Sequence, residues 1–233
     1  MTDTPTVRDF ARLRELVHAI GKHGNKPGEA LLSLYPKCKP FLSDSERAWC
    51  ERVAFGSSVS SHVANGNVLF TRRSVRRWTE QPIGDGDLHA MAEAARWAPS
   101  GCNRQPIELV AIRQRETIEA IASARRQPFI AGAPCVLAVV VAMESYKANA
   151  EYFALLDTGA AVQNMLLAAE QHALGACWVN MAPTEPGFAA VHAMLGTPEH
   201  YRIASLVAVG HPAEHPYPPG RKGMQIHAER FSP

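Results

Sequence analysis

The 233-residue sequence lacks the short motifs that mark several large enzyme classes. It has no Gly-x-Gly-x-x-Gly after an apolar run, no Walker-type glycine loop and no Gly-x-Ser-x-Gly elbow. In other proteins these motifs bind dinucleotides, bind nucleoside triphosphates or carry a nucleophilic serine. A dinucleotide fold of the usual kind, a nucleoside triphosphatase and a serine hydrolase are therefore not indicated. Any phosphate group must be held by side chains, chiefly those of arginine.

The sequence also lacks closely paired cysteines. Its five cysteines are odd in number, widely spaced and never arranged as Cys-x-x-Cys: Cys38, Cys50, Cys102, Cys135 and Cys177. This spacing argues against a disulfide framework and against a structural zinc site. We therefore expect a reducing, cytoplasmic environment and no bound metal, and we assign Cys102 and Cys177 to packing.

Long hydrophobic runs are missing as well. The longest, "CVLAVVVAM", covers only residues 135–143, whereas a membrane helix needs about 20 apolar residues. The amino terminus carries charge where a secretory signal would be apolar. The net charge is +2 and no basic tract is longer than "RRSVRR", so the charge does not indicate a nucleic-acid-binding surface either. The sequence predicts a soluble protein with neither a membrane nor a nucleic acid as its partner.

Hydrophobic periodicity divides the chain into a helical amino-terminal extension, residues 1–66, and a core domain, residues 67–233. In the extension we expect a helix from Val7, a proline-punctuated loop, and a second helix after the capping-box sequence "SDSE" at 43–46. The core predicts helices near 85–98, 115–125, 148–172 and 186–195, and strands near 107–113, 135–142, 176–181 and 203–210. Gly175 stands where a left-handed cap of the long helix would lie. This alternation without repeats favours mixed α and β layers.

Two basic segments are candidates for binding an anion. "RRSVRRW" places Arg72, Arg73, Ser74 and Arg76 where the chain enters the core, and "PPGRKG" presents Arg221 after the last core strand. Guanidinium groups and a hydroxyl suit phosphate oxygens, which accept several charge-assisted hydrogen bonds. The alternatives are a solvated basic turn and a charged tail, and the residues alone leave both alternatives open.

The stretch "APSGCNRQP", residues 98–106, is polar but nearly uncharged and joins a predicted helix to a predicted strand. Its proline stops the helix, its glycine lets the backbone approach a ligand, and its hydroxyl and amides suit a planar polar partner. An ordinary loop of turn residues is the alternative. In the long helix, Asp157 and Asn164 lie seven residues apart on one face, where a satisfied pair is favoured over catalysis.

Taken in order, five segments resemble the nitroreductase family of FMN-dependent oxidoreductases. They are "RRSVRRW", "AARWAPSGCNRQP", "GAPCVLAVV", "DTGAAVQNMLLAAEQHALGACW" and "VAVGHPAEHPYPPGRKG", which together span residues 68–225, about two-thirds of the chain. The resemblance implies an α+β fold in which helices flank a central, mostly antiparallel sheet. It also implies an intertwined homodimer with two FMN sites at the subunit interface.

The resemblance further implies which residues hold the flavin. Arg72 and Ser74 contact its phosphate with Arg73 nearby, Arg76 approaches the ribityl chain and the N1/O2 edge of the ring, and Arg221 closes on the phosphate. The other subunit lines the ring with Pro99, Ser100, Gly101, Asn103 and Gln105. The segment with Val179 and Asn180 passes the flavin N5 side.

The implied activity is a ping-pong reduction of a small organic acceptor, such as a nitroaromatic compound, a quinone or an enone, with NADH or NADPH as co-substrate. The flavin carries the hydride, so no side chain is assigned as a catalytic acid or base. Two alternatives remain open. One is another flavin reaction on the same fold, namely reductive dehalogenation, azoline oxidation or flavin breakdown, and the other is a non-enzymatic flavin-binding protein.

Overall fold

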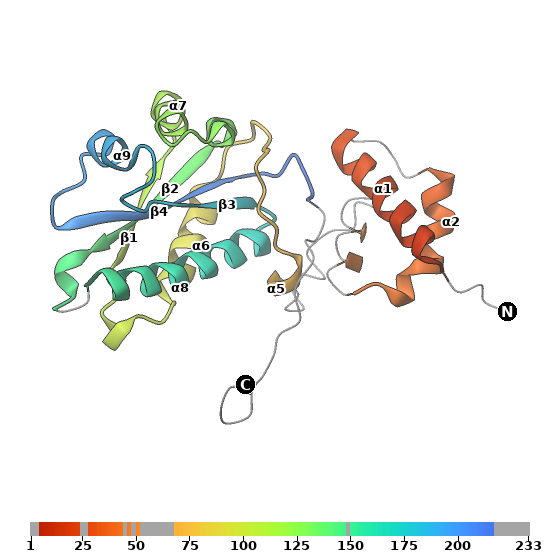
Figure 1. Cartoon of the computed structure of the whole chain (residues 1–233), viewed down its shortest axis with the longest axis horizontal. Coiled ribbons are helices and arrows are strands. Elements are labelled where there is room, and N and C mark those ends of the chain that lie inside the picture. Colours follow the sequence, from red (N-terminus) through yellow and green to blue (C-terminus); the bar gives the residue numbers. More distant parts are fainter. Residues whose placement is uncertain are drawn as a thin grey trace.

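The structure is a computed structural model that describes residues 5–23, 28–43, 46–47, 50–51, 68–147 and 150–216. Helix α1 (Val7–His23) and helix α2 (Glu29–Cys38) pack together, and a 3-10 turn, η1 (Lys39–Phe41), follows α2 (Figure 1). Their shared cluster of buried side chains includes Leu13, Val17, Leu31 and Tyr35. The predicted helix from Val7 is confirmed, while the predicted boundary at residue 66 lies outside the described residues.

The expected loop after α1 is wrong, because residues 29–38 form α2. Proline removes one main-chain hydrogen bond from a helix interior. Pro36 nevertheless lies in α2, since Leu31, Tyr35 and Cys38 place one apolar face in the buried cluster and this burial outweighs the lost bond. The predicted capping box is confirmed: the Ser43 N–H donates to the Glu46 carboxylate at 3.1 Å, and the Glu46 N–H donates to Ser43 Oγ at 3.4 Å.

The core domain is an antiparallel four-stranded sheet with helices on both faces (Figure 1). The strands are β1 (Ile107–Ile112), β2 (Cys135–Ala142), β3 (Gly175–Asn180) and β4 (Tyr201–Gly210), in the order β1-β2-β4-β3. Helices α6 (Asp85–Arg96) and α8 (Ala150–Gln171) cover one face. Helix α7 (Arg115–Ala124), the 3-10 helix η3 (Pro128–Gly132) and helix α9 (Phe188–Met194) cover the other. This arrangement confirms the expected α+β class.

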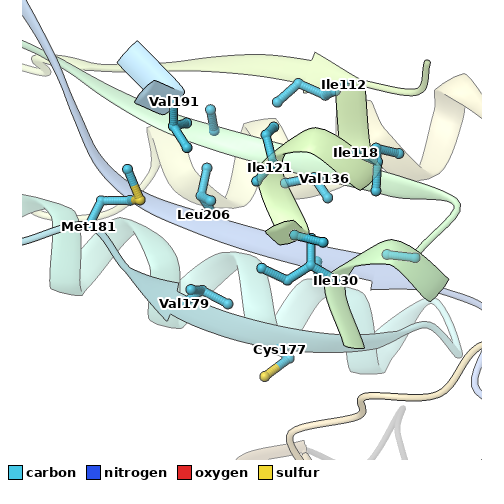
Figure 2. Packing of buried hydrophobic residues seen from close by; sticks show 14 of the residues in the cluster. Ile112, Ile118, Ile121, Ile130, Val136, Cys177, Val179, Met181, Val191 and Leu206 are labelled. Atoms are coloured by element: carbon cyan, nitrogen blue, oxygen red, sulfur yellow. The ribbon is translucent and has the colours of Figure 1, made fainter. Parts of the chain in front are cut away.

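Strand β2 is apolar on both sides because both of its faces are covered. Cys135, Leu137 and Val139 pack toward α6 and α8, whereas Val136 and Ala138 alternate toward α7. Figure 2 shows the latter cluster, in which Ile118 and Ile121 of α7 lie over Val136 and Leu206. The sheet is thereby a rigid layer between two apolar interiors, and its edge strand β3 carries one part of the candidate site.

Candidate functional site

The basic segment at 72–76 runs beside edge strand β3. Ser74 forms a parallel bridge with Ala176, and the Val75 N–H donates to the Ala176 carbonyl at 3.1 Å. Farther along, the Trp78 indole N–H donates to the Gly175 carbonyl at 2.8 Å. Main-chain pairing therefore fixes this segment and leaves its polar side chains to make other contacts.

Gly175 has a different role from the predicted helix cap. It begins β3, and the left-handed residue after α8 is Ala173, with φ 56°. A Cβ atom on Gly175 would lie 2.7 Å from the side chain of Val75. The glycine is required because the basic segment packs directly against the start of β3.

The charges of Arg72 and Arg76 both affect the pKa of the Cys177 thiol. Burial raises the pKa of Cys177, and the positive charges of Arg76 and Arg72 act in the opposite direction. Figure 2 shows the Cys177 side chain at the β3 side of the apolar cluster. Since alternate residues of an extended chain share a face, Arg72, Ser74 and Arg76 form one polar row beside β3.

Arg73, also predicted as a site residue, donates from Nη1 to the Arg72 carbonyl at 2.8 Å. Near the end of the row, the Arg76 N–H donates to Glu214 Oε1 at 2.6 Å, and the Arg76 guanidinium lies 5.6 Å from the centre of the Phe129 ring. The structure thus brings four predicted residues, Arg72, Arg73, Ser74 and Arg76, into one short segment. Arg221, which is also predicted to contact the phosphate, lies outside the described residues.

The loop at 98–106 has an unusual backbone for a segment with one glycine. Cys102, Asn103 and Gln105 all have left-handed φ angles of 51–54°. Side chains other than glycine adopt this region at a cost, and such strain is typical of ligand-binding loops. Internal hydrogen bonds hold the loop: Ser100 Oγ accepts from the Gln105 N–H at 2.9 Å, and Asn103 Oδ1 accepts from the Gln105 amide at 3.3 Å.

Helix α8 anchors this loop through Asp157, whose side chain is buried (5% exposed). Its Oδ1 accepts from the Gly101 N–H at 3.0 Å, and its Oδ2 accepts from the Tyr146 hydroxyl at 2.7 Å. Burial and this hydrogen bond raise the pKa of Tyr146, so the phenol keeps its proton and remains a donor. Arg104 closes the arrangement, with Nη1 donating to the Gly101 carbonyl at 2.7 Å and its guanidinium 5.8 Å from the Tyr146 ring centre.

A pocket of 180 Å³ opens between the loop and α8. Its walls include the predicted site residues Pro99, Ser100 and Gln105, together with Asp157 and Ala161 of α8. The expectation that Asp157 and Asn164 are satisfied structural groups is confirmed. Asn164 Nδ2 donates to the Ala94 carbonyl of α6 at 3.0 Å.

The third predicted element is the end of β3. The Val179 side chain is buried in the apolar cluster of Figure 2, and its carbonyl accepts from Ser205 Oγ at 3.0 Å. Asn180 is exposed, and its carbonyl accepts from Arg125 Nη2 at 3.0 Å. At the end of β3 the Val179 side chain is therefore buried, whereas the Asn180 side chain is exposed.

Within one protomer the basic segment and the loop lie toward opposite ends of α8. The loop is anchored at Asp157, whereas the basic segment pairs with β3 just beyond the end of α8 at Gln171. At a rise of 1.5 Å per residue, the helix between these two residues spans roughly 20 Å. Within the single chain, these two parts of the predicted site therefore lie apart.

The amino-terminal half of α8 exposes several large apolar side chains. Tyr152, Leu155 and Leu156 are 52–66% exposed at helical spacing, and the exposed Trp178 of β3 reaches the α8 backbone at Gly159. Large contiguous apolar patches on a protein surface mark interaction sites. These apolar side chains can therefore pack against an apolar surface of another molecule.

Comparison with known proteins identifies the family. The sequence profile of the nitroreductase family matches residues 69–125 and 119–211. The chain belongs to this family. The match covers both the basic segment and the strained loop, and it leaves the amino-terminal helices outside.

Several nitroreductase-family relatives are similar over most of the core domain. A protein of Archaeoglobus fulgidus named as a candidate NADH dehydrogenase/NAD(P)H nitroreductase is 31% identical over 71% of this chain and 92% of its own length. An NADH dehydrogenase of Thermus thermophilus is 32% identical over 66% of this chain and 89% of its own length. The crystal structure of a candidate nitroreductase of Desulfovibrio desulfuricans in complex with FMN is 30% identical, with a TM-score of 0.60 over 73% of this chain and 98% of the other.

Three residues with evident roles in this nitroreductase-family site were not predicted: Tyr146, Arg104 and Arg125. Each acts on a partner that is distant in sequence or through its position above a ring, and neither feature appears in a local pattern.

Two further findings concern other classes of site. No helix in the described part of the chain has the length and apolarity that a membrane crossing requires. The described residues also contain no group of three His, Cys, Asp or Glu side chains that could hold a metal ion.

Proposed function

We propose that the protein is an FMN-dependent oxidoreductase that uses NADH or NADPH to reduce a small organic acceptor, such as a nitroaromatic compound, a quinone or an enone. The observation that carries the proposal is the polar row of Arg72, Ser74 and Arg76, which main-chain pairing holds beside β3. The names of the relatives support it, since they include an NAD(P)H nitroreductase, an FMN reductase of Bacillus subtilis and a nitroreductase with FMN bound.

The residues present fit a flavin mononucleotide. Phosphate is bound well by arginine because guanidinium N–H groups match its oxygens, and the row provides Arg72 and the Ser74 hydroxyl for this contact. The loop at 98–106 offers polar edges and a pocket of 180 Å³ to a flat heterocycle. When bound, FMN supplies the hydride chemistry at its N5 atom.

The side chains of this protein have binding and electrostatic roles in the proposed reaction. Arg72 and Ser74 hold the phosphate, with Arg73 nearby and Arg221 as a further contact. Arg76 places a fixed positive charge near the N1/O2 edge, where reduction of the ring puts negative charge. Such a preorganised charge favours the reduced state without rearrangement during the reaction.

We propose that NAD(P)H and the electron acceptor bind one after the other at the same place. The backbone at Val179 and Asn180 borders that place, and the nicotinamide leaves before the acceptor enters. This ping-pong order explains why the sequence needs no dinucleotide-binding fold, because the nicotinamide ring only visits the site. We also propose a cytoplasmic location, which suits the five free cysteines.

A homodimer completes the proposed site. The polar row of one protomer and the loop of its partner, with Pro99, Ser100, Gly101, Asn103 and Gln105, would enclose one flavin. The separation along α8 and the apolar face with Tyr152, Leu155 and Leu156 both support this arrangement. A second copy presents a face of the same character, so the two faces bury each other.

The function is tested by optical spectroscopy under anaerobic conditions. The purified protein, or the protein loaded with FMN, should have the absorbance of bound flavin, and NADH or NADPH should bleach it. A colourless protein that ignores added FMN contradicts the proposal. A flavin that neither nicotinamide bleaches excludes the reductase and favours another flavin reaction or a binding protein.

Mixing two variants tests the shared site. Arg72→Ala/Arg76→Ala removes the row, and Asp157→Ala removes the loop anchor, so dimers of either variant bind FMN weakly. After the two variants are unfolded and refolded together, about half of the dimers are mixed and each carries one intact site, which restores roughly a quarter of the sites. No recovery at an FMN concentration below the Kd of either variant would show that each site is built within one protomer.

A further inference from the structure

Arg125 is a buried cation between α7 and the end of β3. It caps the carboxyl end of α7, and its side chain is only about 2% exposed. Nη2 donates to the Asn180 carbonyl at 3.0 Å and lies 3.5 Å from the Glu185 carboxylate, while Nη1 donates to the Pro186 carbonyl. Nε is buried and has no hydrogen-bond partner among the described residues. The two terminal nitrogens therefore make all the contacts that link Arg125 to β3 and the following turn.

The turn at 181–187 also presses against the end of α7. Gly187 has a φ angle of 74°, and a Cβ atom there would lie 2.4 Å from the Ala124 carbonyl. On the other side, Met181 inserts its side chain into the apolar cluster of Figure 2. Helix α7 and this cluster thus fix the backbone that directly follows Val179 and Asn180.

The stability of the fold alone does not explain why an arginine is buried at this position. Apolar side chains of similar volume often stabilise a protein as well as a buried ion pair does, because removing charges from water is costly. What an apolar side chain cannot do is hydrogen-bond two carbonyls of one turn in a fixed geometry. Arg125 joins the carbonyl before the turn, at Asn180, to the carbonyl near its end, at Pro186.

We infer that Arg125 is a positioning residue for the proposed reaction. Its guanidinium fixes the backbone from Asn180 to Gly187, which borders the place where nicotinamide and acceptor approach the flavin. This inference rests on the proposed function. We assign Arg125 to positioning rather than to direct catalysis because its described side-chain contacts are all to protein groups.

The inference predicts different effects on the affinity for FMN and on the rate of flavin reduction. The flavin phosphate is held by the polar row beside the start of β3, at the other end of that strand from Asn180. Loss of the Arg125 contacts should therefore change the Kd for FMN less than about threefold. Reduction at saturating NAD(P)H should slow at least about tenfold, since displacement of reacting groups by about 1 Å can cost 100-fold in rate.

The test compares Arg125→Met, which removes the charge and both hydrogen bonds, with Arg125→Lys, which keeps the charge but lacks the planar fork. Arg113→Met is the matched control, because Arg113 is an exposed arginine whose guanidinium pairs with Asp85 on the far side of α6. Three measurements are made on each variant: FMN affinity, the anaerobic reduction rate at saturating NAD(P)H, and hydrogen exchange of the apo protein.

The expected result is slow reduction with nearly normal FMN affinity in Arg125→Met, partial rescue in Arg125→Lys, and faster exchange confined to peptides covering 180–188. Equal reduction rates in Arg125→Met and Arg113→Met would overturn the inference, as would unchanged exchange at 180–188. A rate loss that follows the fraction of flavin bound would overturn it as well. If the wild-type flavin is not reduced at all, the proposed function fails, and the exchange measurement still decides whether Arg125 fixes the turn.

Discussion

The basic segment at 72–76 and the loop at 98–106 are held in opposite ways. In the basic segment, main-chain pairing to β3 fixes the backbone, and the side chains of Arg72, Ser74 and Arg76 take no part in that pairing. In the loop, side chains of the protein hold a strained backbone: Asp157 accepts from Gly101, and Ser100 accepts from Gln105.

This difference assigns different tasks to the two regions. A row of arginines on a segment paired to β3 provides charge, and its contribution to binding depends on hydrogen bonds to the ligand. A loop with three left-handed residues provides shape, and its contribution depends on a conformation that must be maintained. Variants in the row should therefore change ligand affinity at nearly constant stability, while variants of the loop anchor should change both.

The largest effect is expected for Arg72→Ala/Arg76→Ala. Each lost charge-assisted hydrogen bond costs about 1.5 to 3 kcal/mol, so two losses cost about 3 to 6 kcal/mol, roughly a 10²- to 10⁴-fold increase in the Kd for FMN. Flavin fluorescence titration measures the affinity, and urea unfolding of the apo protein should change little.

Arg77→Ala is the matched control for this double variant. Arg77 is an exposed arginine of the same segment, one position out of step with the polar row. Its replacement should leave the Kd within about twofold, as is usual for an exposed side chain away from the contacts. An equal loss in Arg77→Ala would mean that the general positive charge of the segment, rather than the row, binds the phosphate.

Asp157→Ala should have an intermediate effect, on stability as well as on affinity. It leaves the Gly101 N–H and the buried Tyr146 hydroxyl without their acceptor, at a cost of about 1 to 3 kcal/mol in the free energy of unfolding. Urea denaturation of Asp157→Ala, Tyr146→Phe and the double variant forms a cycle that isolates the contact between the two side chains. Additive effects, together with unchanged FMN affinity in Asp157→Ala, would contradict the anchoring role.

The same contrast explains how much could be predicted from the sequence. Side-chain charge is a local property, so the row at 72–76 was recognised from its letters, and the two-sided burial of β2 followed from its unbroken apolar run. The contacts that hold the loop at 98–106 and the turn at 181–187 join residues that are far apart in the sequence. Asp157 and Gly101 are 56 residues apart, and Arg125 and Pro186 are 61 apart, so no spacing rule links them.

Two errors have the same physical origin. Pro36 was interpreted as a loop residue because proline disfavours a helix interior, but burial of the α2 face against α1 outweighed that preference. Gly175 was interpreted as a helix cap, although its lack of a side chain serves a contact with Val75, 100 positions earlier in the chain. In both places tertiary packing determined the outcome, and local propensity was the weaker influence.

The smallest effects come from a pair of glycines that tests the main-chain support of the row. Gly175→Ala places a methyl group 2.7 Å from Val75 and should destabilise the protein by about 1 to 3 kcal/mol through overpacking. Because the row is displaced with Val75, FMN affinity should fall as well. Gly86→Ala, in the first turn of α6 with nothing within 4 Å of the added methyl, should instead stabilise by about 0.4 to 1 kcal/mol. Thermal unfolding with and without FMN distinguishes the two, and if Gly175→Ala lost stability but kept full FMN affinity, the row would not depend on its pairing with β3.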